Sequence, residues 1–451
     1  MRPSGQIRPT YADSFRCIGS ACEDTCCQGW AVPIDRQTYE KYQNLPDVPL
    51  QALVQSSVVA QPMGADGAEP VPFAKILMTK ENQCPLLNEE RLCRVQIACG
   101  ESFLSHACAV YPRVINTIDG APDMSLSLSC PEAARLVLLN PNLLREAYAA
   151  QQSFAIPEQN PALAQEASEA SSASVSRPLA HFWPIRASVL ALLRQRSYPL
   201  WQRLFLLGIL CRRLDSIARD ELDRPVRDFL VDFDRTVATG ALLPAMETLP
   251  VDRPAQLDVV LRLAGMLLHR SNVRPRFVEC IQAFTTGIGN GPQATLDSLS
   301  AHYAEAHDRH YAPFFARHPY ILENYLINTI FRTHFPFGKK GAQPLETPDM
   351  TREFALLTAQ FALMKGLLIG VAGFHRMNFT AEHVVHTMQA ASKHFEHHPE
   401  FLNQAHALLV ESHMDGARGL AILLRNTDPI GVPRQGAPVA QVPVQQTESA
   451  A

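Results

Sequence analysis

The chain has 451 residues, of which 47% are hydrophobic, and its formal net charge at pH 7 is −4. This length and apolar content allow a large buried core and predict two or three domains. The small negative charge argues against a protein that binds nucleic acid or an anionic membrane surface by electrostatic attraction.

The N-terminal sequence MRPSGQIRPTYADSFRC contains no apolar segment of the kind that a secretory signal peptide requires. We therefore expect a cytoplasmic protein, in a reducing compartment where structural disulfides are rare. In such a compartment, cysteines that cluster in the sequence predict metal ligands or reactive thiols.

The cysteines divide the chain, because nine of the eleven lie between residues 17 and 130. This break in composition predicts a cysteine-rich α+β domain over residues 1–150. Within it, GWAVPI predicts a short strand, and Asp35 is a suitable N-cap for a helix in RQTYEKYQNL. The sequence RVINTI-DGAP-DMSLSLS alternates on both sides of a turn and predicts a hairpin. Pro131 and Glu132, directly after Cys130, predict the start of a helix.

The rest of the chain is expected to be helical. Residues 151–180 are rich in Ala, Ser, Glu and Pro and predict a linker. Residues 181–427 repeat apolar residues at intervals of three and four, which predicts an α-helical bundle domain. The longest apolar run, 354–374, is interrupted by Lys365 and is interpreted as a buried helix rather than a membrane span. The Pro-rich tail, 428–451, predicts disorder. The expected fold class is therefore mainly α.

Four cysteines, Cys17, Cys22, Cys26 and Cys27, lie within eleven residues. Single free cysteines are common in cytosolic cores, but four so close together favour a metal site. The same domain holds a single histidine, His106. Sites built from thiolates alone are typical of iron–sulfur clusters, whereas zinc sites often include histidine. The spacing thus favours a thiolate metal site, with iron–sulfur preferred and zinc left open.

A more specific signal comes from several segments that occur in order: RPTYADSFRCIGSACEDTCCQGWAVPIDRQTYEKY, CPLLNEERLCRVQ, LSHACAVYPR and SLSCPEAARL. They closely resemble the flagellin lysine-N-methylase family, and the middle part is also similar to a broader class of zinc- or iron-chelating domains. The resemblance implies S-adenosylmethionine as methyl donor, lysines of flagellin as substrate, and a [4Fe–4S] cluster.

Carried over to this sequence, the recurring cysteines of the family are Cys17, Cys22, Cys26, Cys27, Cys84, Cys93, Cys108 and Cys130. Cys99 stands where the family is expected to have an apolar residue, and we leave it out. Eight thiols exceed the four that one cluster requires. The resemblance therefore implies the set of eight as metal ligands without selecting four of them.

The resemblance resumes in ENYLINTIFRTHFPFG, residues 323–338. Asn324, Asn328 and Arg332 follow each other at helical spacing on one polar face. Such a face is most simply explained as solvated. The resemblance adds a second interpretation, in which these side chains bind the methionine carboxylate or the ribose of S-adenosylmethionine.

Three further patterns have simpler explanations. TTGIGNG is reminiscent of the S-adenosylmethionine loop of Rossmann-type methyltransferases, but RFVECIQAF before it predicts a helix, so we interpret it as a helix-ending turn. The late histidines are expected on surface helices: His375, His383, His386, His394, His397 and His398. Four tyrosines near the cysteine segments are core aromatics or assist the deprotonation of a lysine, and the sequence does not choose among them: Tyr11, Tyr39, Tyr42 and Tyr111.

The sequence therefore predicts a protein-lysine N-methyltransferase that acts on flagellin, with S-adenosylmethionine and a [4Fe–4S] cluster as cofactors and with no nucleic-acid or membrane partner. The catalytic residues stay open. The alternative is an iron–sulfur or zinc-binding redox or structural interaction module without methyltransferase activity. That alternative would keep its metal and show no affinity for S-adenosylmethionine.

Overall fold

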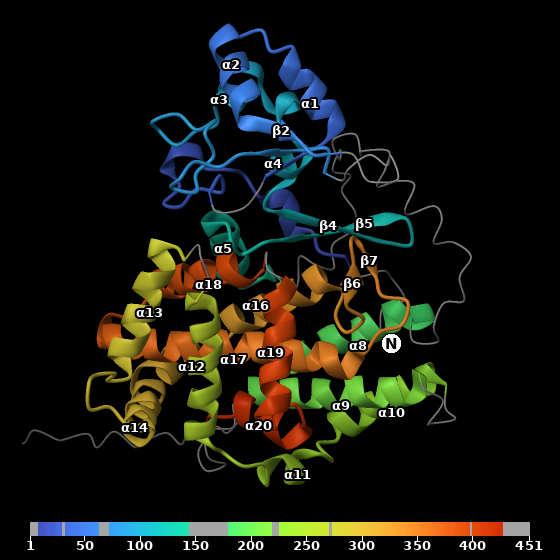
Figure 1. Ribbon diagram of the computed structural model, residues 1–451. Helices are drawn as coiled ribbons and strands as arrows, with labels where there is room; N and C mark the ends of the chain where they lie inside the picture. Colours follow the sequence, from blue (N-terminus) through green and yellow to red (C-terminus); the bar gives the residue numbers. More distant parts are fainter. Residues whose placement is uncertain are drawn as a thin grey trace, which may run out of the picture.

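The computed structural model of the protein describes residues 8–28, 32–62, 72–143, 179–218, 225–269, 273–396 and 399–426. A small cysteine-rich lobe stands on a larger helical body (Figure 1). The predicted fold class, mainly α with an N-terminal α+β part, is confirmed. The predicted tail, 428–451, and residues 151–178 of the predicted linker lie outside the described residues.

The small lobe is built on a three-stranded antiparallel sheet in the order β1 (Pro33–Ile34), β3 (Ala74–Ile76) and β2 (Val58–Ala60). Its helices are α1 (Arg36–Gln43), α2 (Val48–Ser57), α3 (Arg94–Cys99) and α4 (His106–Val110). As predicted, Asp35 caps α1, because its carboxylate accepts a hydrogen bond from the Thr38 N–H at 2.8 Å. Apolar side chains of the sheet and of α1 and α2 form a hydrophobic cluster that belongs to this lobe alone.

A hairpin follows the small lobe. Its strands, β4 (Arg113–Ile118) and β5 (Ala121–Leu126), pair in antiparallel register. Asp119 and Gly120 between them have positive φ, 52° and 71°, and two such residues form the tight turn that matches the twist of a hairpin. Helix α5 (Pro131–Leu138) begins directly after Cys130 with Pro131 in its first turn. Both sequence predictions, the hairpin and the helix, are confirmed.

The hairpin and α5 are packed into the helical body. Tyr11, Leu126 and Leu128 are buried in the same hydrophobic cluster as the body helices. Helix α5 packs against α16 (Tyr320–Thr333) and α18 (Ala381–Phe395), and β5 also packs against α16. The change from the hydrophobic cluster of the small lobe to that of the helical body therefore falls between α4 and β4.

The helical body is arranged around α17 (Met350–His375), which contacts seven other α-helices (α9, α12, α13, α14, α18, α19 and α20) (Figure 1). Strands β6 (Lys339–Lys340) and β7 (Gln343–Pro344) form a short hairpin before it. The remaining body helices are α8 (Phe182–Arg194), α9 (Leu200–Ala218), α10 (Val226–Ala238), α11 (Leu243–Glu247), α12 (Arg253–Leu268), α13 (Pro275–Gly287), α14 (Leu296–Ala306), α15 (Ala312–Arg317), α19 (Pro399–Glu411) and α20 (Ala417–Leu424).

Helix α17 contains the apolar run that was predicted to be a buried helix. By length and composition it could span a membrane, but its most apolar window is entirely buried inside the protein. Lys365 is buried as well, and its ammonium donates hydrogen bonds to the Leu423 and Leu424 carbonyls at 2.8 and 2.9 Å, which satisfies the C-terminal end of α20. Gly370 lies against Phe284 of α13, where a side chain would collide with the neighbouring backbone. The prediction of a core helix is confirmed.

Two other expectations have different outcomes. TTGIGNG is a helix end, as predicted, because α13 ends at Gly287 and Gly289 has a φ of 72°. The surface assignment is wrong for His394, which is 4% exposed and packs against Phe277 with a ring separation of 4.5 Å. His394 faces the core because α18 presents that side to α13. His397 and His398 lie outside the described residues.

Candidate functional site

The cysteine segment 17–28 lies at the junction of the small lobe and the helical body. Gly19 begins a short 3-10 turn at a φ of 58°, and after it the chain runs without regular structure to Gln28. The segment is tied to the lobe by a hydrogen bond from the Cys84 N–H to the Cys27 carbonyl at 2.8 Å. Gln28 and Gln83 continue this contact as an isolated β-bridge. This pairing brings thiols that are distant in the sequence to one place.

Cys26 and four other thiols form one group of five. They come from three segments, which hold Cys26 with Cys27, Cys84 with Cys93, and Cys108. Burial raises the pKa of Cys84 to about 11 and that of Cys108 to about 12, and the charge of Cys26 raises both further. Cys26 also acts on Cys93, whose pKa is raised chiefly by burial. These mutual effects require the five thiols to lie within electrostatic range of one another.

Cys26 is the most acidic member of this group. Its Sγ lies 3.8 Å from the Sγ of Cys27, and a hydrogen bond from Cys27 lowers the pKa of Cys26 to about 7, although burial opposes the shift. The same contact raises the pKa of Cys27. The Lys393 ammonium also favours the Cys26 thiolate. A thiolate is the form that binds a metal or acts as a nucleophile.

The remaining predicted ligands form a second group. Burial raises the pKa of Cys22 and raises that of Cys130 to about 12, and Cys17 acts on Cys22 while Cys22 and Cys26 act on Cys130. Cys99, which the sequence analysis left out, is influenced by Asp47 rather than by another thiol. By these electrostatic effects the eight predicted cysteines divide into a group of five and a group of three, and Cys26 acts on members of both groups.

The donor set was compared with the two metals that the sequence left open. Tetrahedral zinc with bonds of about 2.3 Å would hold its sulfur ligands about 3.8 Å apart. Among the described residues, no three side chains of His, Cys, Asp or Glu are placed to hold a single metal ion. A [4Fe–4S] cluster binds each thiolate to a different iron, so its ligands stand further apart than those of a single zinc ion, and a donor set made of thiols alone is typical of that chemistry.

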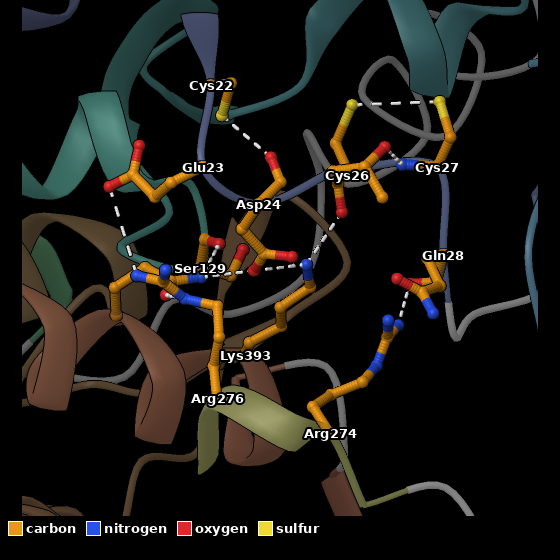
Figure 2. A network of polar contacts seen from close by, with 12 residues as sticks. Cys22, Glu23, Asp24, Cys26, Cys27, Gln28, Ser129, Arg274, Arg276 and Lys393 are labelled. Carbon is orange, nitrogen blue, oxygen red and sulfur yellow. Dashed lines mark hydrogen bonds and ion pairs between the residues drawn. The ribbon is translucent and has the colours of Figure 1, made fainter. Parts of the chain in front are cut away.

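Helix α18 clamps the cysteine segment from the side of the body. Lys393 donates hydrogen bonds to the Asp24 carboxylate and to the Thr25 carbonyl, both at 2.7 Å. Gln389 donates to the same carboxylate and to the Ser129 carbonyl, both at 2.8 Å. Figure 2 shows Lys393 reaching up between Asp24 and the backbone beside Cys26. Burial alone would raise the pKa of Asp24, but Lys393 and Gln389 hold it below its ordinary value.

A cleft of about 200 Å³ lies beside this clamp. Glu23, Asp24 and Gln28 of the cysteine segment form one wall, and Arg274 and Arg276 at the start of α13 form another. Arg274 also donates a hydrogen bond to the Gln28 carbonyl (Figure 2). A larger hollow of about 570 Å³ lies at the end of α17, between Thr286 and Asn378, and contains none of the predicted site residues.

The polar face of α16 that holds Asn324 and Asn328 is buried, so its interpretation as a solvated face is wrong. The Asn324 amide donates to the Val137 and Asn140 carbonyls at 2.9 and 2.7 Å and so satisfies the end of α5. Asn328 forms a pair of hydrogen bonds with the backbone of Leu126 on β5, at 3.2 and 2.8 Å. These amides hold α16 against the hairpin and α5.

Arg332, the third predicted cofactor-binding residue, lies in a different environment from the two amides. Its Nε has no hydrogen-bond partner and lies 3.7 Å from a carboxylate oxygen of Glu396, whose side chain is 3% exposed. Arg332 is therefore held by a long ion pair with Glu396 rather than by a hydrogen bond.

Sequence reasoning missed a buried chain of hydroxyl groups next to the thiols. The Tyr111 and Ser129 hydroxyls are 3.0 Å apart, and those of Ser129 and Ser127 are 2.6 Å apart. The Ser127 hydroxyl donates to the Glu396 carboxylate at 2.7 Å. The signal was present in DMSLSLS, because serines at every second position share one face of an extended chain.

The chain was compared with known proteins. Residues 186–423 match the family model described as the FliB lysine N-methylase C-terminal domain. The flagellar biosynthetic protein FliU of Salmonella muenchen is 34% identical over 136 residues, which are 30% of this chain and 78% of that protein. The lysine-N-methylases of Salmonella typhimurium LT2 and Salmonella choleraesuis are each 34% identical over 148 residues, which are 32% of this chain and 36% of theirs. No solved structure matches.

Proposed function

Because the chain belongs to the FliB lysine N-methylase family, we propose that it transfers methyl groups from S-adenosylmethionine to lysine side chains of flagellin. The observation that carries the proposal is the family match, which covers residues 186–423, together with the names of the relatives that match the chain. Flagellin would be modified in the cytoplasm, before its export.

The five thiols around Cys26 support a [4Fe–4S] cluster as the metal group. One cluster requires four thiolates, so four of these five thiols would supply its ligands: Cys26, Cys27, Cys84, Cys93 and Cys108. When bound, the cluster would join three segments of the small lobe and contribute its binding free energy to the fold. Cys17, Cys22 and Cys130 are the alternative ligands. Cys26 would belong to either ligand set, because it acts electrostatically on both groups of thiols.

The protein's own residues have separate tasks in this proposal. Lys393 and Gln389 fix the segment that presents Cys26, and the cleft between Asp24 and Arg274 admits the substrate lysine beside it. Asn324 and Asn328 brace α16, and Arg332, whose Nε makes no hydrogen bond beside its long ion pair with Glu396, would bind the carboxylate of S-adenosylmethionine. A site at the junction of two packed parts is a common place for a ligand pocket.

The test is co-expression with flagellin, followed by intact-mass analysis of the flagellin. We expect mass increments of one methylene each, located on lysines by peptide mapping. Cys26→Ser should abolish both the iron content and the increments, whereas Cys211→Ser, a buried thiol of the helical body, should leave both in place.

Unchanged flagellin mass, with iron and S-adenosylmethionine both bound to the protein, would overturn the proposal. Iron without affinity for S-adenosylmethionine would identify the redox or structural module instead.

A further inference from the structure

Methyl transfer to nitrogen requires a neutral amine, but a lysine side chain has a pKa of about 10.4 in water and carries a proton at neutral pH. A transferase that acts on lysine must therefore provide a route for this proton. The acceptor has to lie beside the substrate entrance, and the proton has to move away from the reacting nitrogen.

The hydroxyl chain described above has the required geometry. Its three links measure 3.0, 2.6 and 2.7 Å and lead from Tyr111 through Ser129 and Ser127 to Glu396. Each hydroxyl can donate and accept at the same time, and Glu396 at the end is a pure acceptor when ionised. The negative charge of Glu396 is paired with Arg332. The chain thus ends on a buried carboxylate that can receive a proton.

Among the four tyrosines near the cysteine segments, Tyr111 alone is connected in this way. The Tyr11 hydroxyl is committed to Asn328 at 2.7 Å, and its ring is buried. Tyr42 is buried in the core of the small lobe, and Tyr39 packs edge-on against Phe73. Tyr111 is only half-buried. Geometry therefore selects Tyr111.

Tyr111 is within electrostatic range of two residues that line the cleft. Charged and titratable groups that act on it are Cys130, Cys26 and Asp24, and Tyr111 in turn acts on Arg274. Asp24 and Arg274 are both cleft residues. At the other end of the chain, Arg332, Tyr325 and Lys339 face Glu396. The hydroxyl chain therefore leads from Tyr111, which the charges of Cys130 and Cys26 reach, to Glu396 at the end of α18.

We propose that Tyr111, Ser129, Ser127 and Glu396 form a proton relay that deprotonates the substrate lysine, with Tyr111 as the catalytic residue that contacts the lysine ammonium. This inference rests on the proposed function. The ammonium gives a proton to the Tyr111 oxygen while Tyr111 passes its own hydroxyl proton to Ser129. Ser129 passes a proton to Ser127, and Ser127 passes one to Glu396.

The products of this shift are a neutral amine and a carboxylic acid, so charge and protons balance. The amine nitrogen then attacks the methyl carbon of the sulfonium donor, the carbon–sulfur bond breaks, and sulfur keeps the electron pair. Between turnovers, after the methylated product has left, Glu396 returns its proton through the same hydroxyls to Tyr111, which releases a proton to solvent.

The experiment measures flagellin methylation rates as a function of pH for the iron-loaded protein and for Glu396→Gln, which keeps the side-chain shape but cannot accept a proton. We expect kcat at neutral pH to fall about 100-fold, the contribution typical of general-base catalysis, with an unchanged KM for flagellin. The loss should shrink as the pH rises toward about 10.4, because solvent then deprotonates the lysine.

Ser127→Ala interrupts the relay without changing a charge and should reproduce this pH-dependent loss. The matched control is Glu353→Gln, a half-buried carboxylate at the start of α17, whose methylation rate should keep the wild-type pH profile. A Glu396→Gln or Ser127→Ala protein that methylates at the wild-type rate, or that is slowed equally at every pH, overturns the relay alone. A wild-type protein that leaves flagellin unmethylated overturns the proposed function and the relay with it.

Discussion

The clamp between Lys393 and the cysteine segment should carry much of the local stability of the site. Lys393→Met removes an ammonium that donates two hydrogen bonds of 2.7 Å, one of them to Asp24, while the side chains of Lys393 and Asp24 are only 10% and 13% exposed. Removing one partner of a buried ion pair costs about 3–5 kcal/mol. Gln389 still reaches Asp24, so the lower end of this range, about 3 kcal/mol, is expected.

The loss should appear in two measurements. Urea unfolding followed by circular dichroism gives the free energy of unfolding, and alkylation of Cys130, a buried thiol beside the clamp, followed by mass spectrometry reports local opening. The matched control is Arg235→Met, which removes the cation of an ion pair whose side chains are 70% and 44% exposed. Such a pair contributes less than about 1 kcal/mol.

A double variant, Asp24→Asn with Lys393→Met, should recover part of the lost stability, because it leaves no buried charge without a partner. The reasoning would be refuted by a Lys393→Met protein that unfolds within about 0.5 kcal/mol of wild type and alkylates at the wild-type rate.

Two further predictions concern the helical body. Gly370→Ala would place a Cβ 2.7 Å from the Phe284 carbonyl oxygen and should lower the free energy of unfolding, measured in urea, by about 2 kcal/mol. Gly265→Ala in α12, with open space around it, should raise that free energy by about 0.5 kcal/mol. Equal effects of the two substitutions would contradict this packing. Burial raises the pKa of Glu353 to about 7, so its contribution to the free energy of unfolding is full below about pH 4.3 and is lost as the pH rises through about 7. Glu353→Gln should therefore flatten the fall in unfolding free energy between about pH 5 and about pH 8. An unchanged fall would exclude Glu353 as its source.

Local signals in the sequence were sufficient wherever neighbouring residues determine the structure. Asp35 caps its helix through a residue three positions away, and the hairpin turn at Asp119 and Gly120 is set by two adjacent residues with positive φ. The core position of α17 followed from its apolar composition, because a helix that is hydrophobic on all sides has to be buried.

Partners that lie far apart in the sequence were beyond this reasoning. Helical periodicity places Asn324 and Asn328 on one polar face, but it does not say that this face meets the ends of a strand and a helix. For the same reason, periodicity does not reveal that Lys393 binds Asp24, which lies 369 positions earlier in the chain. The cysteines were recognised as a set because of their residue type, yet their division into five and three required the fold.

The buried serines of β5 and of the loop after it combine a local sequence pattern with partners that lie far away in the chain. A strand at the edge of a core normally turns apolar side chains inward, but Ser125, Ser127 and Ser129 are all buried, between 0% and 2% exposed. Burying a hydroxyl costs free energy unless it finds a partner. Ser127 and Ser129 find theirs in Glu396 and Tyr111, each contributed by a different part of the molecule. A row of apolar residues would pack the same seam at lower cost, so the hydroxyls are better explained by the proton that they can carry than by stability.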